Sequence, residues 1–221
     1  IFSEAEDFTC ALANREGELI AVADFCPSQI GGVPLLVRSM LKEIPLSEID
    51  EGDVIVHNDP YRGGLHTPEH TVFKPIFIDG EISAFSVCVG HFVEVGGMAP
   101  GGFPGEATEI FHEGLRIPIV KLVEQGKTNP FIIDLLEANV RTPESTIGDL
   151  IANVTCNEVG GRQLLEFMDE YNINDLGSLS DAIRSQSELA MRSKIQEIKN
   201  GLYKNQIMIE AIDESIPLVC N

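Results

Sequence analysis

The amino-acid sequence predicts an α+β fold, with a β-hairpin-rich N-terminal part and a helical C-terminal part. Two hairpin patterns favour strands in the first half of the chain. The stretch "FTCALANREGELIAVADF" (8–25) has β-prone runs around Asn-Arg-Glu-Gly, and 70–92 has two apolar runs around Asp-Gly. After Pro130, apolar residues recur at helical spacing, which favours helices.

Between the two hairpins, the spacing of apolar residues predicts a helix over 31–44, and a short strand follows over 53–57. Residues 94–117 contain six Gly and two Pro, which predicts a long loop of the kind that often carries function. The run 118–127 is typical of a strand or a short helix.

In the second half we expect helices over 129–140, 145–171 and 178–201, the second of them capped by Thr142 and opened by Pro143. These elements divide the chain into a β-rich region (1–128) and a mainly helical region (129–221). The two regions form one compact unit or a fragment of a longer chain.

The net charge of −20 and the pI near 4.4 argue against binding to nucleic acid or to an anionic membrane surface. No apolar run reaches the 18 residues that a membrane span needs. The five cysteines are odd in number and form no C-x-x-C motif, which indicates a reduced, cytoplasmic protein. Cys10 and Cys88 lie in apolar runs, where a free cysteine behaves as a small hydrophobe.

All five histidines fall between residues 57 and 112. His66 and Glu69 precede the first strand of the 70–92 hairpin and His91 ends its second strand, so the hairpin brings these three residues together. Two imidazoles and one carboxylate suit Zn²⁺, Mn²⁺ or Fe²⁺ and leave positions open for water or substrate. The three residues are therefore candidate metal ligands.

A polar turn without metal remains the competing interpretation of "HNDPYRGGLHTPEH" (57–70). His57 suits a packing role, strand alternation points His70 away from Glu69, and His112 lies in the glycine-rich loop without an evident partner. The chain has neither a G-x-S-x-G elbow nor a Walker-type loop. If the reaction uses ATP, we expect the nucleotide to bind another chain.

Five blocks of the sequence resemble the hydantoinase B / 5-oxoprolinase family, and they follow in family order from Asp7 to about Asn153. The blocks are "EDFTCALANREGELIA", "GDVIVHNDPYRGGLHTPEHTVFKPIF", "GHFVEVGGMAPGG", "ATEIFHEGLRIPIVKL" and "ANVRTPESTIGDLIAN". Glu69 and Glu94 stand where the family usually has Asp, and Phe25 and Gln29 stand where many members have His. These departures are consistent with a different metal or substrate.

The resemblance implies a metal-carrying subunit that works in a hetero-oligomer with a hydantoinase A-type subunit, which binds ATP and phosphorylates the substrate. The pair would open small cyclic amides such as hydantoin, 5-oxoproline or caprolactam. Carried over to this chain, the family's metal ligands are Asp7, His66, Glu69 and His91, of which Asp7 comes from the resemblance alone.

The implied reaction also assigns roles to residues around the metal. Glu94 or His70 would be the general base or orient it, and Asn58 and Asp59 would shape the turn. Arg116 and Arg141 are candidates for contacts with phosphate or an anionic substrate, or they form structural ion pairs.

Two alternative functions remain open at this point. One is a subunit of an ATP-dependent ketone carboxylase of the acetone or acetophenone type. The other is a non-catalytic assembly subunit with a structural metal or none, although the absence of Cys from 57–70 argues mildly against a structural zinc site.

Overall fold

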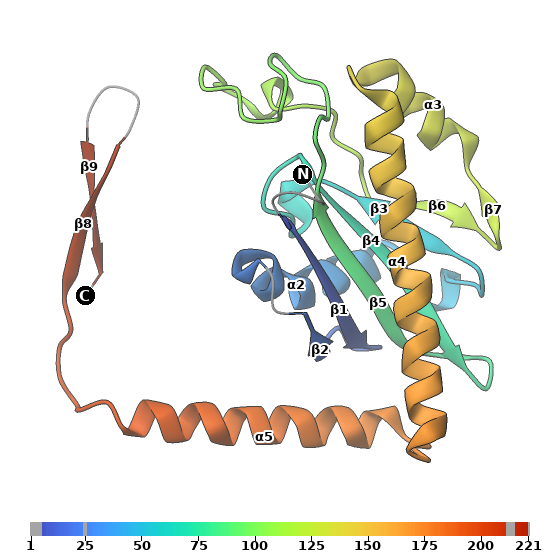
Figure 1. Ribbon diagram of the computed structural model, residues 1–221, viewed down its shortest axis with the longest axis vertical. Coiled ribbons are helices and arrows are strands. Elements are labelled where there is room, and N and C mark those ends of the chain that lie inside the picture. Colours follow the sequence, from blue (N-terminus) through green and yellow to red (C-terminus); the bar gives the residue numbers. More distant parts are fainter. Residues whose placement is uncertain (1–5, 24–25, 211–214, 221) are drawn as a thin grey trace. The chain divides into compact units, whose positions relative to one another are not determined.

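The computed structural model describes residues 6–23, 26–210 and 215–220. The chain divides into two compact units, residues 1–182 and 183–221. The first unit holds an antiparallel sheet of seven strands in the order β2-β1-β5-β4-β3-β6-β7 (Figure 1). The strands are β1 (Phe8–Asn14), β2 (Leu19–Val22), β3 (Val54–His57), β4 (Glu69–Ile78), β5 (Glu81–His91), β6 (Val120–Glu124) and β7 (Lys127–Thr128).

Helices cover both faces of this sheet (Figure 1). Helix α2 (Pro27–Glu43) packs on one face, and α4 (Pro143–Glu170) crosses the other, with α3 (Pro130–Asn139) packed beside α4. Three short 3₁₀ helices lie in the connections, namely η1 (Leu46–Glu48), η2 (Pro60–Arg62) and η3 (Ile110–His112). The predicted α+β class is confirmed.

The core has two halves, one on each side of the sheet, because successive strand residues point to opposite faces. Ile55 packs with the α2 side, whereas its neighbours Val54 and Val56 pack with the α4 side. Likewise Phe73 belongs to the α2 half and Val72 to the α4 half. This alternation decides which face each functional side chain occupies.

The local signals that predicted the hairpins act as expected. Asp79 and Gly80 both have positive φ, 53° and 82°, in the two-residue turn between β4 and β5. Asn14 closes the β1–β2 turn by accepting the backbone N–H groups of Glu16 and Glu18 on its side-chain oxygen, at 3.1 and 2.8 Å. The pairing of β4 with β5 then brings the outer ends of 69–91 together.

The helix starts differ in how they are capped. The Asn129 side chain accepts the N–H of Phe131 at 3.1 Å and caps α3. Thr142 is the N-cap residue of α4 and Pro143 opens the helix, as predicted, but the Thr142 side chain makes none of the expected cap bonds.

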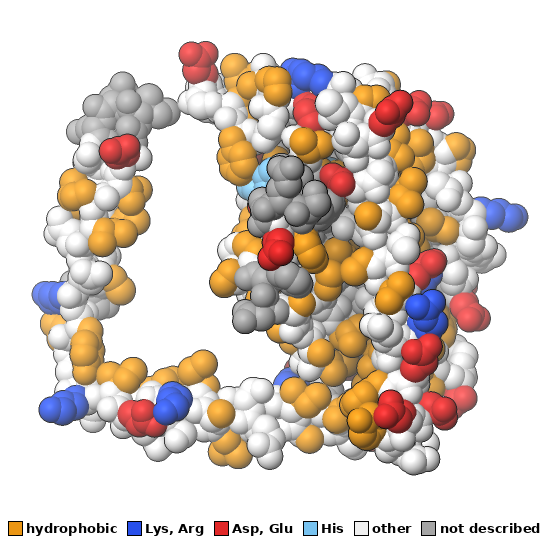
Figure 2. Space-filling model, viewed as in Figure 1, with side chains coloured by type: hydrophobic (Ala, Val, Ile, Leu, Met, Phe, Trp, Pro, Cys, Tyr) orange, Lys and Arg blue, Asp and Glu red, His pale blue; other side chains and the backbone are white. Residues whose placement is uncertain are grey.

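Helix α5 (Leu176–Gln196) begins in the first unit and continues into the second, where β8 (Asn205–Glu210) and β9 (Ser215–Cys220) form an antiparallel hairpin. The sequence patterns did not predict this hairpin within the mainly helical region. Its residues are exposed throughout, and Figure 2 shows hydrophobic side chains on its surface. In the described part of the chain, no helix is long and apolar enough to cross a bilayer.

Candidate metal centre

The buried side chain of Asn58 holds the connection between β3 and β4 in place. Its amide nitrogen donates to the carbonyl oxygens of Thr67 and Leu115, at 2.7 and 2.8 Å. Its side-chain oxygen accepts the N–H of Ile117 at 2.5 Å. The three bonds join the 57–69 turn to residues 115–117.

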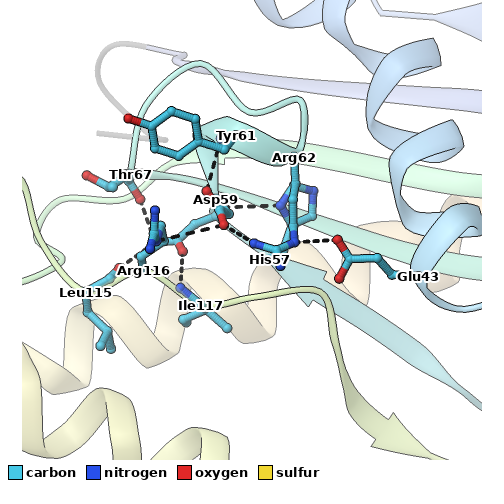
Figure 3. Close-up of polar contacts among 10 residues, drawn as sticks. Glu43, His57, Asp59, Tyr61, Arg62, Thr67, Leu115, Arg116 and Ile117 are labelled. Carbon is cyan, nitrogen blue, oxygen red and sulfur yellow. Dashed lines mark hydrogen bonds and ion pairs between the residues drawn. The ribbon is translucent and has the colours of Figure 1, made fainter. Parts of the chain in front are cut away.

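Asp59 organises the outer side of the same turn (Figure 3). Its buried carboxylate pairs with Arg62, and it lies 3.8 Å from the guanidinium of Arg116. Arg62 also donates to Glu43 at 2.5 Å. Arg116 also lies over the rings of Tyr61 and Phe111, which makes it part of a surface network.

Asp7, His66, Glu69 and His91 are brought together at the ends of β1, β4 and β5. Glu69 and His91 are direct partners in the β4–β5 ladder, and the N–H of His91 donates to the backbone oxygen of Asp7 at 3.0 Å. The His66 ring lies edge-on to the His91 ring, with centroids 4.8 Å apart. The structure thus gathers the four predicted ligands, while their role as ligands stays a prediction.

Gln29 from α2 joins the cluster as a fifth member. Its side chain is 1% exposed, and its amide nitrogen donates both to Asp7 Oδ1 and to Glu69 Oε1, each at 2.9 Å. The sequence marked Gln29 only as a departure from the family, and did not assign it to the centre. Phe25, the other departure in that segment, lies outside the described residues.

Burial sets the charge of the cluster. Burial lowers the pKa of His66, and the nearby His91 lowers it further by a smaller amount. Burial also lowers the pKa of His91. The Asp7 carboxylate opposes both shifts. Burial raises the pKa of Glu69, with the Gln29 hydrogen bond acting in the opposite direction. Both imidazoles are therefore held neutral near pH 7, with their lone pairs available.

Several nitrogen and oxygen atoms of the cluster are buried without a partner among the described residues. They are His66 Nδ1, both ring nitrogens of His91, and Gln29 Oε1. Buried polar atoms are nearly always satisfied, so unpartnered ones next to two carboxylates need an explanation. By its chemistry, a donor set of two imidazoles and two carboxylates suits Zn²⁺, Mn²⁺ or Fe²⁺.

The glycine-rich loop borders the cluster through Phe103. The Phe103 ring lies 5.5 Å from that of His91, nearly parallel to it, and meets the His66 ring edge-on at 5.0 Å. Gly102 packs so closely on Pro68 that an added Cβ would lie 2.2 Å from Pro68 Cγ. A cavity of about 370 Å³ beside His66 is lined by this loop, including Phe103 and Glu113.

The two predicted general bases lie outside this arrangement. His70 is fully buried on the α4 side of β4, where its ring stacks on Phe92 at 3.9 Å. The Glu94 carboxylate binds the N–H of Gly96 at 2.7 Å and both the backbone and the guanidinium of Arg141, at 2.5 and 2.7 Å. The geometry therefore gives neither residue a contact with the cluster, and Arg141 holds a structural ion pair.

The two remaining histidines have other surroundings. His57 is buried, its ring stacks on Phe73, and its Nδ1 accepts the N–H of Asp59 at 3.3 Å. His112 lies in η3 within 3.3 Å of the Glu109 carboxylate. These positions agree with packing for His57 and a loop contact for His112.

Comparison with known proteins gives one consistent result. The family model described as Hydantoinase B/oxoprolinase matches residues 1–220. The chain is 33% identical over 210 residues to the beta subunit of the caprolactamase of Pseudomonas jessenii, covering 95% of this chain and 36% of that protein. It is 30% identical over 207 residues to the B-type subunit of a putative D-/L-hydantoinase of Pseudomonas sp. strain NS671, covering 92% and 35%.

The fold is also found in a solved structure. The crystal structure of the ATP-dependent caprolactamase from Pseudomonas jessenii matches with a TM-score of 0.86 and 33% identity, over 93% of this chain and 35% of that one. The chain spans about a third of the length of the caprolactamase and hydantoinase subunits that it matches.

Proposed function

The chain belongs to the hydantoinase B/oxoprolinase family, and we propose that it provides the divalent-metal centre of an ATP-dependent enzyme that opens cyclic amides. The observation that carries this proposal is the convergence of Asp7, His66, Glu69 and His91, with unpartnered imidazole nitrogens buried beside two carboxylates. The similarity to one subunit of a caprolactamase and to one of a putative hydantoinase supports a hydrolase that acts on cyclic amides.

We assign the metal ligands to the four residues of the cluster. His66 and His91 are suited to ligation because their lowered pKa values keep them neutral, and Asp7 and Glu69 supply oxygen donors. A divalent cation held there would lower the pKa of water, making hydroxide available near neutral pH. Gln29 keeps the two carboxylates oriented toward the same point through its two hydrogen bonds.

We assign the substrate ring to the cavity beside His66. The cavity is bounded by Phe103 and by the glycine-rich loop, and its volume of about 370 Å³ suits a small cyclic amide. The exposed ring of Phe103 offers an apolar surface next to both imidazoles. In this role Phe103 would hold the substrate and limit the access of water.

We infer that ATP is supplied by a hydantoinase A-type partner, in a hetero-oligomer. The sequence lacks a Walker-type loop, and the names of the relatives, each given as one subunit, imply further chains. The partner would turn the amide oxygen into a phosphate leaving group before water attacks the carbon. The cytoplasm is the proposed location, since the five cysteines are free thiols in the described structure.

The test is turnover by the full protein reconstituted with an ATP-binding partner of the hydantoinase A type. Hydantoin, 5-oxoproline and caprolactam are offered with ATP, in parallel with acetone plus bicarbonate. We expect ring opening that depends on ATP and falls at least 100-fold in His66→Ala and His91→Ala. The exposed-loop variant His112→Ala serves as the control and keeps its activity.

Two results would replace this proposal by an alternative. Bicarbonate-dependent turnover of a ketone, without ring opening, would favour the carboxylase. Ring opening that is unaffected by His66→Ala and His91→Ala, with only stability lowered, would indicate a non-catalytic assembly subunit.

A further inference from the structure

Three cysteine sulfurs from distant parts of the sequence meet on the α4-covered face of the sheet. Cys10 comes from β1, Cys88 from β5 and Cys156 from α4. Their Sγ atoms all lie within 4.8 Å of one another, with Cys10 at 3.8 Å from Cys88 and at 3.3 Å from Cys156. All three are free thiols, and we refer to them as the cysteine triad.

The backbone holds the triad together by two separate means. Cys10 and Cys88 are direct partners in the β1–β5 ladder, so their side chains point to the same face. Helix α4 comes close to this face at Gly160, one turn after Cys156, where an added Cβ would lie 2.8 Å from Ser86 Oγ. Gly160 therefore lets α4 approach this face closely, and a larger residue there would require the Ser86 side chain to move.

The described residues that line the groove beside the triad carry no charge that would balance a thiolate. Cys10 and Cys156 line a groove of about 600 Å³, whose other lining residues, such as Leu12, Val22 and Val159, are apolar or uncharged. Cys88 is buried, and its Sγ lies 3.2 Å from the side-chain oxygen of Asn153. A bound cation would supply the missing positive charge.

We propose that Cys10, Cys88 and Cys156 form a second metal site, for a thiophilic d¹⁰ cation of the Zn²⁺ or Cu⁺ type. Three sulfur donors without a carboxylate select soft or borderline metals over Mg²⁺, Ca²⁺ or Mn²⁺. Sulfurs bound to tetrahedral zinc at about 2.3 Å lie about 3.8 Å apart, which is the Cys10–Cys88 separation. Tetrahedral ligation would require Cys156 Sγ to move from 3.3 Å to about 3.8 Å from Cys10 Sγ.

Cation binding at the triad forms three metal–sulfur bonds and breaks the S–H bonds of the thiols that bind, whose protons pass to solvent. A fourth ligand would come from the groove.

This site is separate from the candidate centre at His66 and does not depend on the proposed function. Val87 and Val89 point to the α2 side, so Cys88 points to the α4 side, while His91 shares the α2 side with Gln29. The sheet lies between the two sets of ligands.

The first experiment reads thiolate ligation directly. The full chain carrying Cys26→Ser and Cys220→Ser, reduced and free of metal, is titrated with Cd²⁺ while the ultraviolet sulfur-to-metal charge-transfer band is recorded. We expect a band with the intensity for three thiolates, which stops growing once one Cd²⁺ per chain occupies the triad. Adding Cys156→Ser should remove about a third of the band and weaken binding more than about tenfold. The double variant His66→Ala/His91→Ala should keep the band, which separates this site from the other centre.

A second measurement needs no substitution in the triad. Zn²⁺ should slow alkylation of Cys10 and Cys156 in the wild-type chain, without slowing that of Cys220. The proposal is overturned if Cd²⁺ gives no thiolate band, if the band is unchanged by Cys156→Ser, or if Zn²⁺ leaves the alkylation rates unchanged.

Discussion

Glu69 and His91 are direct partners across the β4–β5 ladder, and both side chains leave the sheet on the face that α2 covers. The pairing carries the His91 ring to within 4.8 Å of the His66 ring, and Gln29 reaches the Glu69 carboxylate from α2 at 2.9 Å. The candidate centre thus rests on strand register, which is among the most strongly specified features of a sheet with a buried face.

Replacing Gln29, whose amide joins the two carboxylates, should destabilise the metal-free protein. Gln29→Glu removes the donor shared by Asp7 and Glu69 and adds a third carboxyl group at a buried position. We expect the free energy of unfolding at pH 7 to fall by about 2 kcal/mol or more, measured by urea titration. The loss should shrink as the pH falls, because protonation removes the repulsion.

Gln186→Glu adds the same charge at an exposed position of α5 and serves as the matched control. Its free energy of unfolding should stay within about 0.5 kcal/mol of the wild type. Equal losses for the two variants would mean that the effect of Gln29→Glu comes from net charge alone.

Asn58→Ala should be strongly destabilising. The substitution leaves the carbonyl oxygens of Thr67 and Leu115 and the N–H of Ile117 without their buried partner. We expect a loss of about 3 kcal/mol in chemical denaturation. Asn139→Ala is the control, since Asn139 is exposed and makes one side-chain bond to its own helix; a loss as large there would contradict the explanation.

Gly102→Ala should disturb the metal centre from a distance. Gly102 has φ of 72°, and an added Cβ would collide with Pro68, which lies between His66 and Glu69 in the sequence. We expect at least a tenfold loss of divalent-metal affinity by calorimetry. Gly105 lies in the same loop, and a Cβ added there would meet open space, so Gly105→Ala should bind the metal as the wild type does. A wild-type metal affinity for Gly102→Ala would show that the loop does not support the turn.

His57 should make the protein sensitive to acid. Burial lowers its pKa from 6.5 to about 4, so the unfolded chain takes up this proton first as the pH falls. The stability from neutral His57 is complete above pH 6.5 and is lost between pH 6.5 and 4, by about 3 kcal/mol. His57→Gln should reduce the pH dependence of the free energy of unfolding in that window by about this amount, and the part that remains is expected from His70, whose pKa burial lowers to about 3.

Local signals in the sequence were enough to predict the hairpins and the meeting of His66, Glu69 and His91. The two-residue turn at Asp79-Gly80 fixes which residues of the two strands pair, so the outer ends of the hairpin must meet. Strand alternation correctly separated His70 from Glu69. It did not show that His70 stacks on Phe92, because that contact depends on how the chain continues after β5.

The parts that the sequence did not predict are contacts between distant elements. Gln29 joins the centre because α2 packs across the sheet, and its separation from Glu69 is 40 residues. The cysteine triad depends on where α4 crosses the sheet, and Cys10 and Cys156 are 146 residues apart. A cysteine in an apolar strand has the same local pattern whether or not a helix brings another thiol to it.

The central claim is that Asp7, His66, Glu69 and His91 hold a divalent cation, and Mn²⁺ tests it most directly. Mn²⁺ prefers oxygen and imidazole donors over thiolates, so its binding is insensitive to the cysteine triad. Binding to the metal-free full chain is measured by calorimetry and by the electron paramagnetic resonance of free Mn²⁺, with Zn²⁺ titrated in parallel. The account predicts one Mn²⁺ per wild-type chain, an affinity at least tenfold lower in His66→Ala and in His91→Ala, and unchanged binding in His112→Ala. The account would be contradicted if no binding of Mn²⁺ or Zn²⁺ depended on His66 and His91.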